Sequence, residues 1–166
     1  MNGVIGYIGV GSNLGDALHN CKDAIGNLSR KNEIQLTGCS SFYKTEPVGL
    51  ENQNWFVNAV VEIKTILSAR DLLNILQSIE KAMGRTREMK GEPRIIDLDL
   101  LFRGQDIINE VDLIVPHPEL HKRCFVLEPL NEIASYFIHP AFGISVRGLK
   151  DRLNDSNIVE LIENIK

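Results

Sequence analysis

The chain has 166 residues, of which 43% are hydrophobic and 24% charged, and its formal net charge is −4 at pH 7. This composition predicts one globular domain over residues 1–166 and excludes a disordered tail, a collagen-like fibre and a coiled coil. The negative charge argues against a general nucleic-acid binder, and no apolar run approaches the roughly 20 residues that cross a membrane.

The first elements expected are a buried strand over residues 4–10 and a helix over residues 14–28. Apolar residues recur at helical spacing in the second segment, so one face of that helix is apolar. Ser12, Asn13 or Asp16 could cap its start, because each offers a side-chain oxygen to free backbone N–H groups.

Two further strands are expected over residues 34–44 and 55–65. Apolar side chains occupy every second position over 57–63, which places them on one face of the strand. Phe56 and Asn58 therefore point to the opposite face.

The clearest pattern predicts a helix over residues 69–83, with Ser68 as its N-cap and Gly84 at its end. A polar loop over 84–94 and a strand over 95–102 follow. The remaining residues form a C-terminal extension.

The order of these elements is β-α-β-β-α-β, which predicts an α+β fold with a ferredoxin-like core. Such a core has an antiparallel sheet with both helices packed on one face. In the C-terminal extension, the pattern predicts a short helix over residues 129–134.

Three cysteines, Cys21, Cys39 and Cys124, are odd in number and far apart in the sequence. No disulfide framework or C-x-x-C pair is present, which favours the reducing cytoplasm. The N-terminal residues have no basic region and no long apolar segment, so we expect no secretory signal.

Asp97 and Asp99 lie two residues apart in the strand expected over 95–102, so their carboxylates project from the same face. Two adjacent carboxylates are unfavourable unless a cation neutralises them, and oxygen ligands favour Mg²⁺. The alternative is an exposed edge strand that carries two solvated aspartates.

Basic residues cluster just before this pair, at Arg85, Arg87, Lys90 and Arg94. The arginine fork donates two aligned hydrogen bonds to phosphate. A carboxylate pair beside an arginine-rich loop suits a metal–polyphosphate substrate. The alternative is a solvated loop whose charge is partly balanced by nearby glutamates.

The glycines at Gly9, Gly11 and Gly15 form a G-x-G-x-x-x-G segment, one residue off the dinucleotide-binding spacing, and no Gly-Lys-Ser/Thr of a P-loop follows. We therefore interpret them as turn glycines. Close approach of the backbone to a ligand is the alternative.

Two weaker signals come later in the chain. His117 lies in a rigid Val-Pro-His-Pro turn and could contact an anion, although a lone histidine is usually structural. Arg123 and Phe125 are two residues apart, a spacing that could direct both side chains at one site.

Together these residues resemble the 6-hydroxymethyl-7,8-dihydropterin pyrophosphokinase family of folate biosynthesis. The resemblance spans residues 5–134 and depends on the order and spacing of several short motifs. They are Gly11-Ser12-Asn13-Leu14, Ser41-Phe42-Tyr43-Lys44-Thr45, Phe56-Val57-Asn58-Ala59, Ile79-Glu80 with Gly84-Arg85, Pro93-Arg94 with Asp97-Leu98-Asp99, and Val115-Pro116-His117. The resemblance implies the ferredoxin-like fold and an enzyme that transfers diphosphate from ATP to the pterin hydroxymethyl group and releases AMP.

The resemblance also implies roles for individual residues. Asp97 and Asp99 are expected to hold two Mg²⁺ ions on the triphosphate and, with Arg85 and Arg94, to form the catalytic group. Phe56 and Phe125 are expected to sandwich the pterin ring. The residues implied for the pterin pocket are Thr45, Pro47, Val48, Phe56, Asn58 and Phe125. Those implied for ATP are Gln77, Glu80, Arg85, Arg87, Arg94, His117 and Arg123, with Leu100 and Ile114 beside the adenine.

This sequence departs from the family pattern in three places. Family members often have a tryptophan in the loop before Pro93-Arg94, and this chain has none there. Pro118 stands where the family often has tyrosine. Glu46 stands where it often has proline.

The implied partners are small molecules, with ATP as co-substrate and Mg²⁺ as cofactor, and a monomer without nucleic-acid or membrane partners is expected. The implied reaction is in-line attack by the pterin hydroxyl on the β-phosphorus of ATP, with no side chain identified as the general base. Two alternatives stay open: a non-catalytic ferredoxin-like module that binds a ligand or RNA, and a small-molecule kinase that releases ADP. RNA binding favours a basic surface and an RNP-like motif, which this chain lacks.

Overall fold

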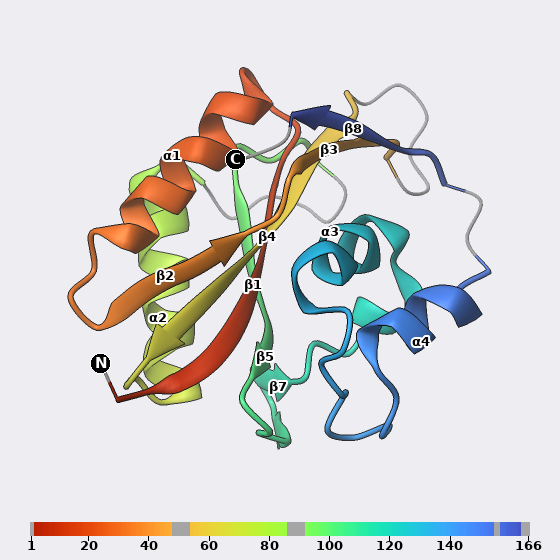
Figure 1. Cartoon of the computed structure of the whole chain (residues 1–166). Helices are drawn as coiled ribbons and strands as arrows, with labels where there is room; N and C mark the ends of the chain where they lie inside the picture. The colour runs from red at the N-terminus through yellow and green to blue at the C-terminus, as the bar shows by residue number, and fades with distance from the viewer. Residues whose placement is uncertain (1, 48–53, 86–91, 155–156, 164–166) are drawn as a thin grey trace.

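Antiparallel strands form the centre of the molecule in the computed structural model, which describes residues 2–47, 54–85, 92–154 and 157–163 (Figure 1). The elements are β1 (Val4–Ser12), α1 (Ala17–Ser29), β2 (Ile34–Cys39), β3 (Phe42–Thr45), β4 (Phe56–Thr65), α2 (Ala69–Ala82), β5 (Asp97–Arg103), β6 (Ile108–Glu110), β7 (Leu113–Val115), the 3₁₀ helix η1 (Leu120–Lys122), α3 (Cys124–Ala134), α4 (Val146–Arg152) and β8 (Val159–Glu163). In the described part of the chain, six strands share one sheet in the order β5-β1-β4-β3-β8, and β2 also pairs with β4.

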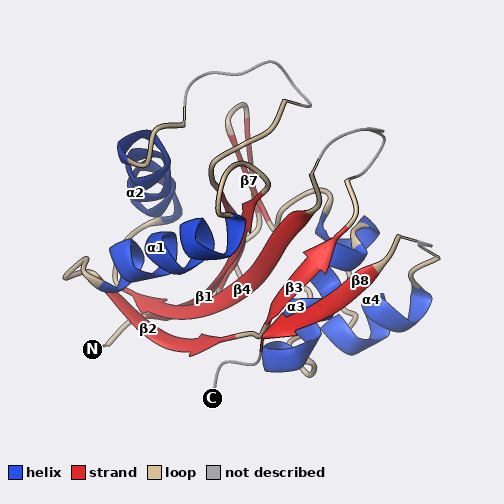
Figure 2. Cartoon of the chain, turned by 90° about the horizontal axis from the view of Figure 1, so that it is seen from above, coloured by secondary structure: helices blue, strands red, loops and turns tan. Residues whose placement is uncertain are grey.

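Helices cover both faces of this sheet. Figure 2 shows α1 and α2 on one face and α3 and α4 on the other. The strands around α1 and α2 follow the β-α-β-β-α-β order, with β2 and β3 together as the second strand, so the ferredoxin-like prediction is confirmed. The C-terminal extension adds the second helical layer and the edge strand β8.

The first helix begins later than predicted. Asp16 is its N-cap, and Asp16 Oδ1 accepts a hydrogen bond from the backbone N–H of His19 at 3.1 Å. Leu14, the first residue of the predicted helix, precedes this cap and is 42% exposed. The buried face of α1 consists of Cys21, Ala24 and Leu28.

The second helix is close to its prediction. Ser68 Oγ accepts from the N–H of Asp71 at 3.1 Å, which satisfies one of the free donors of the first turn. Gly84 has φ +97°, the left-handed conformation that glycine adopts without strain, so the helix ends just before it.

The single strand predicted over residues 34–44 is wrong, because the structure has two strands there. Cys39 pairs with Val61 and Tyr43 pairs with Asn58. The segment from 39 to 43 is therefore one residue longer than the segment of β4 opposite it, from 58 to 61. The extra residue is accommodated at Ser40, whose hydroxyl accepts the N–H of Val60 at 2.8 Å. Such a bulge bends the strand and separates β2 from β3.

The short helix predicted over residues 129–134 is the second half of a longer one. Helix α3 already begins at Cys124 and contains Pro129 in its interior. Proline removes one backbone hydrogen bond, but Val126, Leu127 and Leu130 are buried on either side of it. This burial stabilises the turn that the proline alone would weaken.

Two cores lie on the two faces of the sheet. The first packs under α1 and α2 and includes Val57 and Ala59 of β4, as the alternating pattern predicts. The second packs under α3 and α4 and includes Val60. Phe56 and Asn58 alternate with the first set, so they share the face of α3. Among the described residues, no helix has the length and apolar character needed to cross a membrane.

Candidate active site

A line of residues crosses the sheet because three strands pair in register. Asp97 on β5 pairs with Gly11 on β1, and Gly11 pairs with Asn58 on β4. Cross-strand partners project from the same face of a sheet. Asp97 and Asn58 therefore share one face with a bare glycine between them, and Asp99 pairs with Gly9 in the same way.

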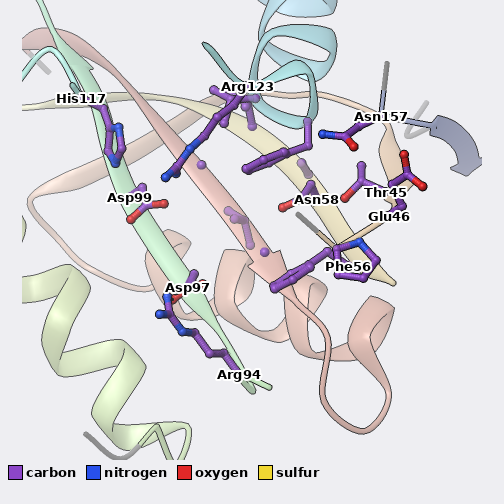
Figure 3. A pocket seen from close by; sticks show the side chains of 18 of the residues that line it. Thr45, Glu46, Phe56, Asn58, Arg94, Asp97, Asp99, His117, Arg123 and Asn157 are labelled. Carbon is purple, nitrogen blue, oxygen red and sulfur yellow. Dashed lines mark hydrogen bonds and ion pairs between the residues drawn. The ribbon is translucent and has the colours of Figure 1, made fainter. Parts of the chain in front are cut away.

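A cavity of about 520 Å³ lies over this line, a volume typical of small-molecule sites. Figure 3 shows its two ends. The charged end contains Arg94, Asp97, Asp99, His117 and Arg123, and the amide end contains Thr45, Glu46, Asn58 and Asn157. The predicted site residues that line the cavity are Thr45, Pro47, Phe56, Asn58, Arg94, Asp97, Asp99, His117, Arg123 and Phe125.

Arginines balance the carboxylates at the charged end. Arg94 Nη1 lies 3.2 Å from both oxygens of Asp97, and Arg85 Nη1 lies 3.0 Å from Asp97 Oδ1. Burial raises the pKa of Asp97, the charge of Asp99 raises it further, and the two arginines only partly offset this. The carboxylate pair is thus a place where added positive charge is favourable.

The donor set at this pair suits Mg²⁺. In the described residues, no group of three or more histidine, cysteine, aspartate or glutamate side chains is arranged to hold a metal ion. Asp97 and Asp99 alone would leave most of a coordination shell to water and to substrate oxygens. Mg²⁺ is commonly bound in this manner, through one or two carboxylates and phosphate.

Glu80, on α2, fixes Arg85 beside Asp97. Its buried carboxylate forms an ion pair with Arg85 and accepts a hydrogen bond from the N–H of Leu98 at 3.1 Å. Burial raises the pKa of Glu80 to about 7, although the hydrogen bond from Leu98 and the charge of Arg85 both lower it. Arg85 therefore lies between two carboxylates, which hold it at the edge of the charged end.

Asn13 positions Arg94. Its backbone N–H donates to Arg94 O at 3.0 Å, and its side-chain Oδ1 accepts from the N–H of Arg94 at 2.7 Å. Asn13 Nδ2 donates to the carbonyl of Asn54 at 3.4 Å. The buried asparagine at the end of β1 thereby connects the segment of Arg94 with the start of β4.

His117 follows the cis peptide bond between Val115 and Pro116. Its Nδ1 accepts a hydrogen bond from the N–H of Glu119 at 3.1 Å, which leaves the proton of the neutral ring on Nε2. Burial lowers the pKa of His117 and so favours that neutral form. The ring can therefore donate a hydrogen bond from Nε2, which suits a phosphate oxygen.

At the amide end, Asn58 is held in one orientation. Asn58 Nδ2 donates to Thr45 Oγ1 at 2.7 Å, and both side chains are buried. This leaves Asn58 Oδ1, an acceptor, above Gly11. A ligand that places an N–H group there would be recognised.

Two aromatic side chains line the same part of the cavity. Phe56 lies at the start of β4, in register with Thr45, and Phe125 lies in the first turn of α3. The Arg123 guanidinium lies 5.5 Å from the centre of the Phe125 ring, within the range of a cation–π contact. A planar ring between these aromatics would lie next to the charged end.

Several predicted site residues are not part of the cavity lining. Leu100 is 5% exposed within the first core, and Ile114, on β7, is 43% exposed. Gln77 is exposed on α2. Arg85 is next to the cavity through its ion pair with Asp97, and Glu80 lies behind it, in contact with Arg85 and the N–H of Leu98. Their contacts with a nucleotide stay predictions. Val48, Arg87 and Lys90 lie outside the described residues.

The turn interpretation is wrong for Gly9 and Gly11, which lie inside β1 and line the cavity floor. Of the three glycines in this segment, Gly15 alone has a positive φ, +67°. The sequence did not identify Asn13, Glu46 or Asn157 as residues of the site. Two glycines spaced two apart within an otherwise apolar strand were the available signal for the floor.

A family described as 7,8-dihydro-6-hydroxymethylpterin-pyrophosphokinase (HPPK) matches residues 7–135 of this chain. A 2-amino-4-hydroxy-6-hydroxymethyldihydropteridine pyrophosphokinase of Bacillus subtilis is 46% identical over 129 residues, 78% of this chain and 77% of that protein. Its counterpart in Haemophilus influenzae is 41% identical over 95% of this chain and 98% of that protein. A folic acid synthesis protein of Pneumocystis carinii is 40% identical over 92% of this chain, which spans only 20% of that longer protein.

Solved structures show the same fold. A Plasmodium falciparum HPPK-DHPS structure with pterin and p-hydroxybenzoate has a TM-score of 0.74 and 16% sequence identity. That match covers 91% of this chain and 43% of the Plasmodium chain. The likeness supports the fold described above.

Proposed function

The chain belongs to the 7,8-dihydro-6-hydroxymethylpterin-pyrophosphokinase family, and we propose that the cavity between Asp97 and Asn58 is its active site. The protein is an ATP-dependent pyrophosphokinase of folate biosynthesis. It transfers diphosphate from ATP to the hydroxymethyl group of 6-hydroxymethyl-7,8-dihydropterin and releases AMP.

The charged end binds the triphosphate. Asp97 and Asp99 would hold the two Mg²⁺ ions that accompany ATP, and these ions would supply positive charge that neutralises the triphosphate. Arg85 and Arg94, which both pair with Asp97, donate hydrogen bonds to phosphate oxygens of the nucleotide. A cation held by Asp97 would take over part of the charge balance that the two guanidinium groups provide.

Other residues of the nucleotide site have narrower roles. His117 donates from Nε2 to a phosphate oxygen, and Arg123 adds positive charge on the side of the pterin. Glu80 holds Arg85 in place through their ion pair. Direct contacts of ATP with Gln77, Arg87, Leu100 and Ile114 remain part of the proposal and are supported by the family resemblance alone.

The amide end binds the pterin. Phe56 and Phe125 stack on the two faces of the ring, and Asn58 Oδ1 accepts from a ring N–H. Thr45 holds the Asn58 carboxamide, and Pro47 closes the side of the pocket. With its amide edge at Asn58, the ring can direct its hydroxymethyl group toward the charged end.

The reaction is an in-line displacement at the β-phosphorus. The hydroxymethyl oxygen forms the new P–O bond, the bond from the β-phosphorus to the α,β-bridging oxygen breaks, and AMP leaves with that oxygen. The hydroxyl proton is released to the solvent, which balances the reaction. Alignment of the two substrates and neutralisation of charge by the arginines supply the catalysis, because the attacking alcohol needs no covalent activation.

One observation carries this proposal: a carboxylate pair and a fixed amide acceptor lie at opposite ends of a single cavity. The test is an assay of the purified protein with ATP, Mg²⁺ and 6-hydroxymethyl-7,8-dihydropterin, in which AMP and ADP are separated. AMP and the pterin diphosphate should form in equal amounts. ADP would indicate a simple kinase, and no turnover would indicate a binding module.

Variants of the carboxylate pair sharpen this test. Asp97→Asn and Asp99→Asn should each reduce AMP formation by orders of magnitude while the melting temperature stays near that of the wild type. Asp23→Asn, at an exposed position of α1, is the matched control. Normal turnover by both active-site variants would refute the role of the pair.

We further propose that residues 1–166 act as one pyrophosphokinase domain, since β8 near the C-terminus pairs with β3 in the same sheet as β1. None of the three cysteines, all within the described residues, forms a disulfide, which supports a reducing compartment such as the cytoplasm.

A further inference from the structure

Asn157 enters the cavity from a part of the chain that the family match does not reach. The match ends at residue 135, whereas Asn157 lies two residues before the start of β8. Figure 3 shows the Asn157 side chain at the amide end, near Thr45 and Glu46. The C-terminal extension thus supplies part of the cavity wall.

Hydrogen bonds to two other elements fix the backbone beside Asn157. Glu46 forms two of them with Ile158: the Glu46 N–H donates to Ile158 O at 3.3 Å, and Glu46 Oε1 accepts from the N–H of Ile158 at 2.9 Å. The Cys124 thiol lies 3.8 Å from Asn157 O and donates to it. The end of β3 and the start of α3 therefore both fix the position of this asparagine.

The register of β8 explains why Asn157 faces the cavity. Thr45 pairs with Val159, so these two residues share a face of the sheet. Residues two apart in an extended chain also share a face. Asn157 is two residues before Val159 and therefore lies on the same face as Thr45, whose hydroxyl belongs to the amide end.

We propose that Asn157 is a substrate-binding residue that contacts the amide-type edge of the pterin. This inference deepens the proposed function and depends on it. A carboxamide offers both a donor and an acceptor, and the pterin edge carries both as well. Asn58 supplies an acceptor from the sheet, and Asn157 supplies the second polar contact from the side wall.

The test compares Asn157→Ala with Asn154→Ala, a control at an exposed asparagine three residues earlier. Pterin affinity is measured by titration in the presence of a non-hydrolysable ATP analogue, and affinity for the analogue is measured alone. Asn157→Ala should weaken pterin binding by about three- to tenfold, the loss of one hydrogen bond. Its KM for pterin should rise equally, with kcat and analogue affinity near wild type. Asn154→Ala should match the wild type throughout.

A second pair of variants tests whether the hydrogen bond between Glu46 and Ile158 contributes to pterin binding. Glu46→Ala removes the acceptor for Ile158 and should also weaken pterin binding. Glu46→Gln keeps an oxygen acceptor and should restore most of the affinity. Equal loss of pterin and analogue affinity in Asn157→Ala would indicate a structural role and overturn the inference.

Unchanged pterin affinity in Asn157→Ala would also overturn it. The failure of the proposed function is a separate result, because there the wild-type protein itself would form no AMP and bind no pterin.

Discussion

Gly11 and Asn58 face each other across β1 and β4 so closely that a Cβ atom on residue 11 would lie 2.6 Å from Asn58 Oδ1. Real Cβ atoms do not approach oxygen to this distance. The orientation of the Asn58 carboxamide, with its Nδ2 bonded to Thr45, therefore requires that residue 11 has no side chain. Under the proposed function, this close approach gives the glycine an indirect part in pterin recognition, through the orientation of Asn58.

Gly11→Ala should displace Asn58 and break its bond to Thr45, so we expect pterin affinity to fall at least tenfold, while affinity for an ATP analogue alone changes little. Gly9→Ala is the matched comparison on the same strand and face. A Cβ there would meet the Leu101 side chain at 3.6 Å, an ordinary contact, so pterin binding should survive. Calorimetric titration of both variants checks this, and equal losses would contradict it.

Asn13→Ala removes the acceptor that holds the N–H of Arg94 and the donor to Asn54. We expect kcat to fall because Arg94 loses its position, and the free energy of unfolding to fall by about 1–3 kcal/mol. Steady-state kinetics and urea unfolding measure the two effects. Asn13→Asp, which keeps an acceptor for Arg94, should recover part of kcat.

The control for Asn13→Ala is Asn74→Ala, at an exposed position of α2. It should leave both quantities unchanged. A wild-type kcat in Asn13→Ala would show that Arg94 does not depend on this asparagine.

Phe56→Ala should weaken pterin binding by about 1–3 kcal/mol, the range measured for stacking of a base on an aromatic side chain. The phenyl ring lines the cavity and makes no contribution to the charged end, so binding of an ATP analogue alone should be retained. Tyr136→Ala, at a tyrosine that is 82% exposed, is the control. If Phe56→Ala weakened both ligands equally, the phenylalanine would be a structural residue instead.

The burial of His139 should make the free energy of unfolding depend on pH. The ring is 3% exposed and stacks on Phe142, and its Nδ1 accepts the N–H groups of Ala141 and Phe142 at 3.1 and 3.2 Å. Burial, and secondly the charge of His121, lower the pKa of His139 below its usual 6.5. The unfolded chain therefore binds more protons than the folded protein as the pH falls below 6.5.

The contribution of His139 to stability is accordingly complete above pH 6.5 and is lost as the pH falls through the pKa of the folded state. Urea unfolding between pH 8 and pH 5 tests this by comparison of the wild type with His139→Gln, which cannot titrate. His117 adds a slope of the same sign in both proteins, and Glu80, whose pKa is raised, adds one of the opposite sign in both. On going from pH 8 to pH 5, the wild type should therefore lose more stability, or gain less, than His139→Gln. Parallel profiles would assign the pH dependence to other groups.

Local patterns predicted the elements that depend on local forces. Helix α2 has a regular apolar stripe and a serine cap, and β4 alternates cleanly, so both were identified close to their observed bounds. The shared face of Asp97 and Asp99 follows from the two-residue period of any strand. These features need no knowledge of neighbouring strands.

Features that depend on pairing between distant segments were not predictable. The bulge at Ser40 arises from the hydrogen bond to Val60, twenty residues away. The place of Asn157 depends on the register of an edge strand with β3, more than a hundred residues earlier in the chain. A glycine in a strand and a glycine in a turn look alike until the partner strand is known, which is why the role of Gly11 was missed.

The cross-strand pairing of Asp97, Gly11 and Asn58 also fixes the distance between the Asp97 carboxylate and the Asn58 carboxamide. Neighbouring strands lie about 4.8 Å apart, so two spacings separate the carboxylate from the carboxamide by roughly 10 Å. Backbone hydrogen bonds between the paired strands hold this separation. If the pterin lies as proposed, the paired strands fix the distance between its amide edge at Asn58 and the carboxylates near its hydroxymethyl group. We therefore expect alcohols of other lengths to be poor substrates.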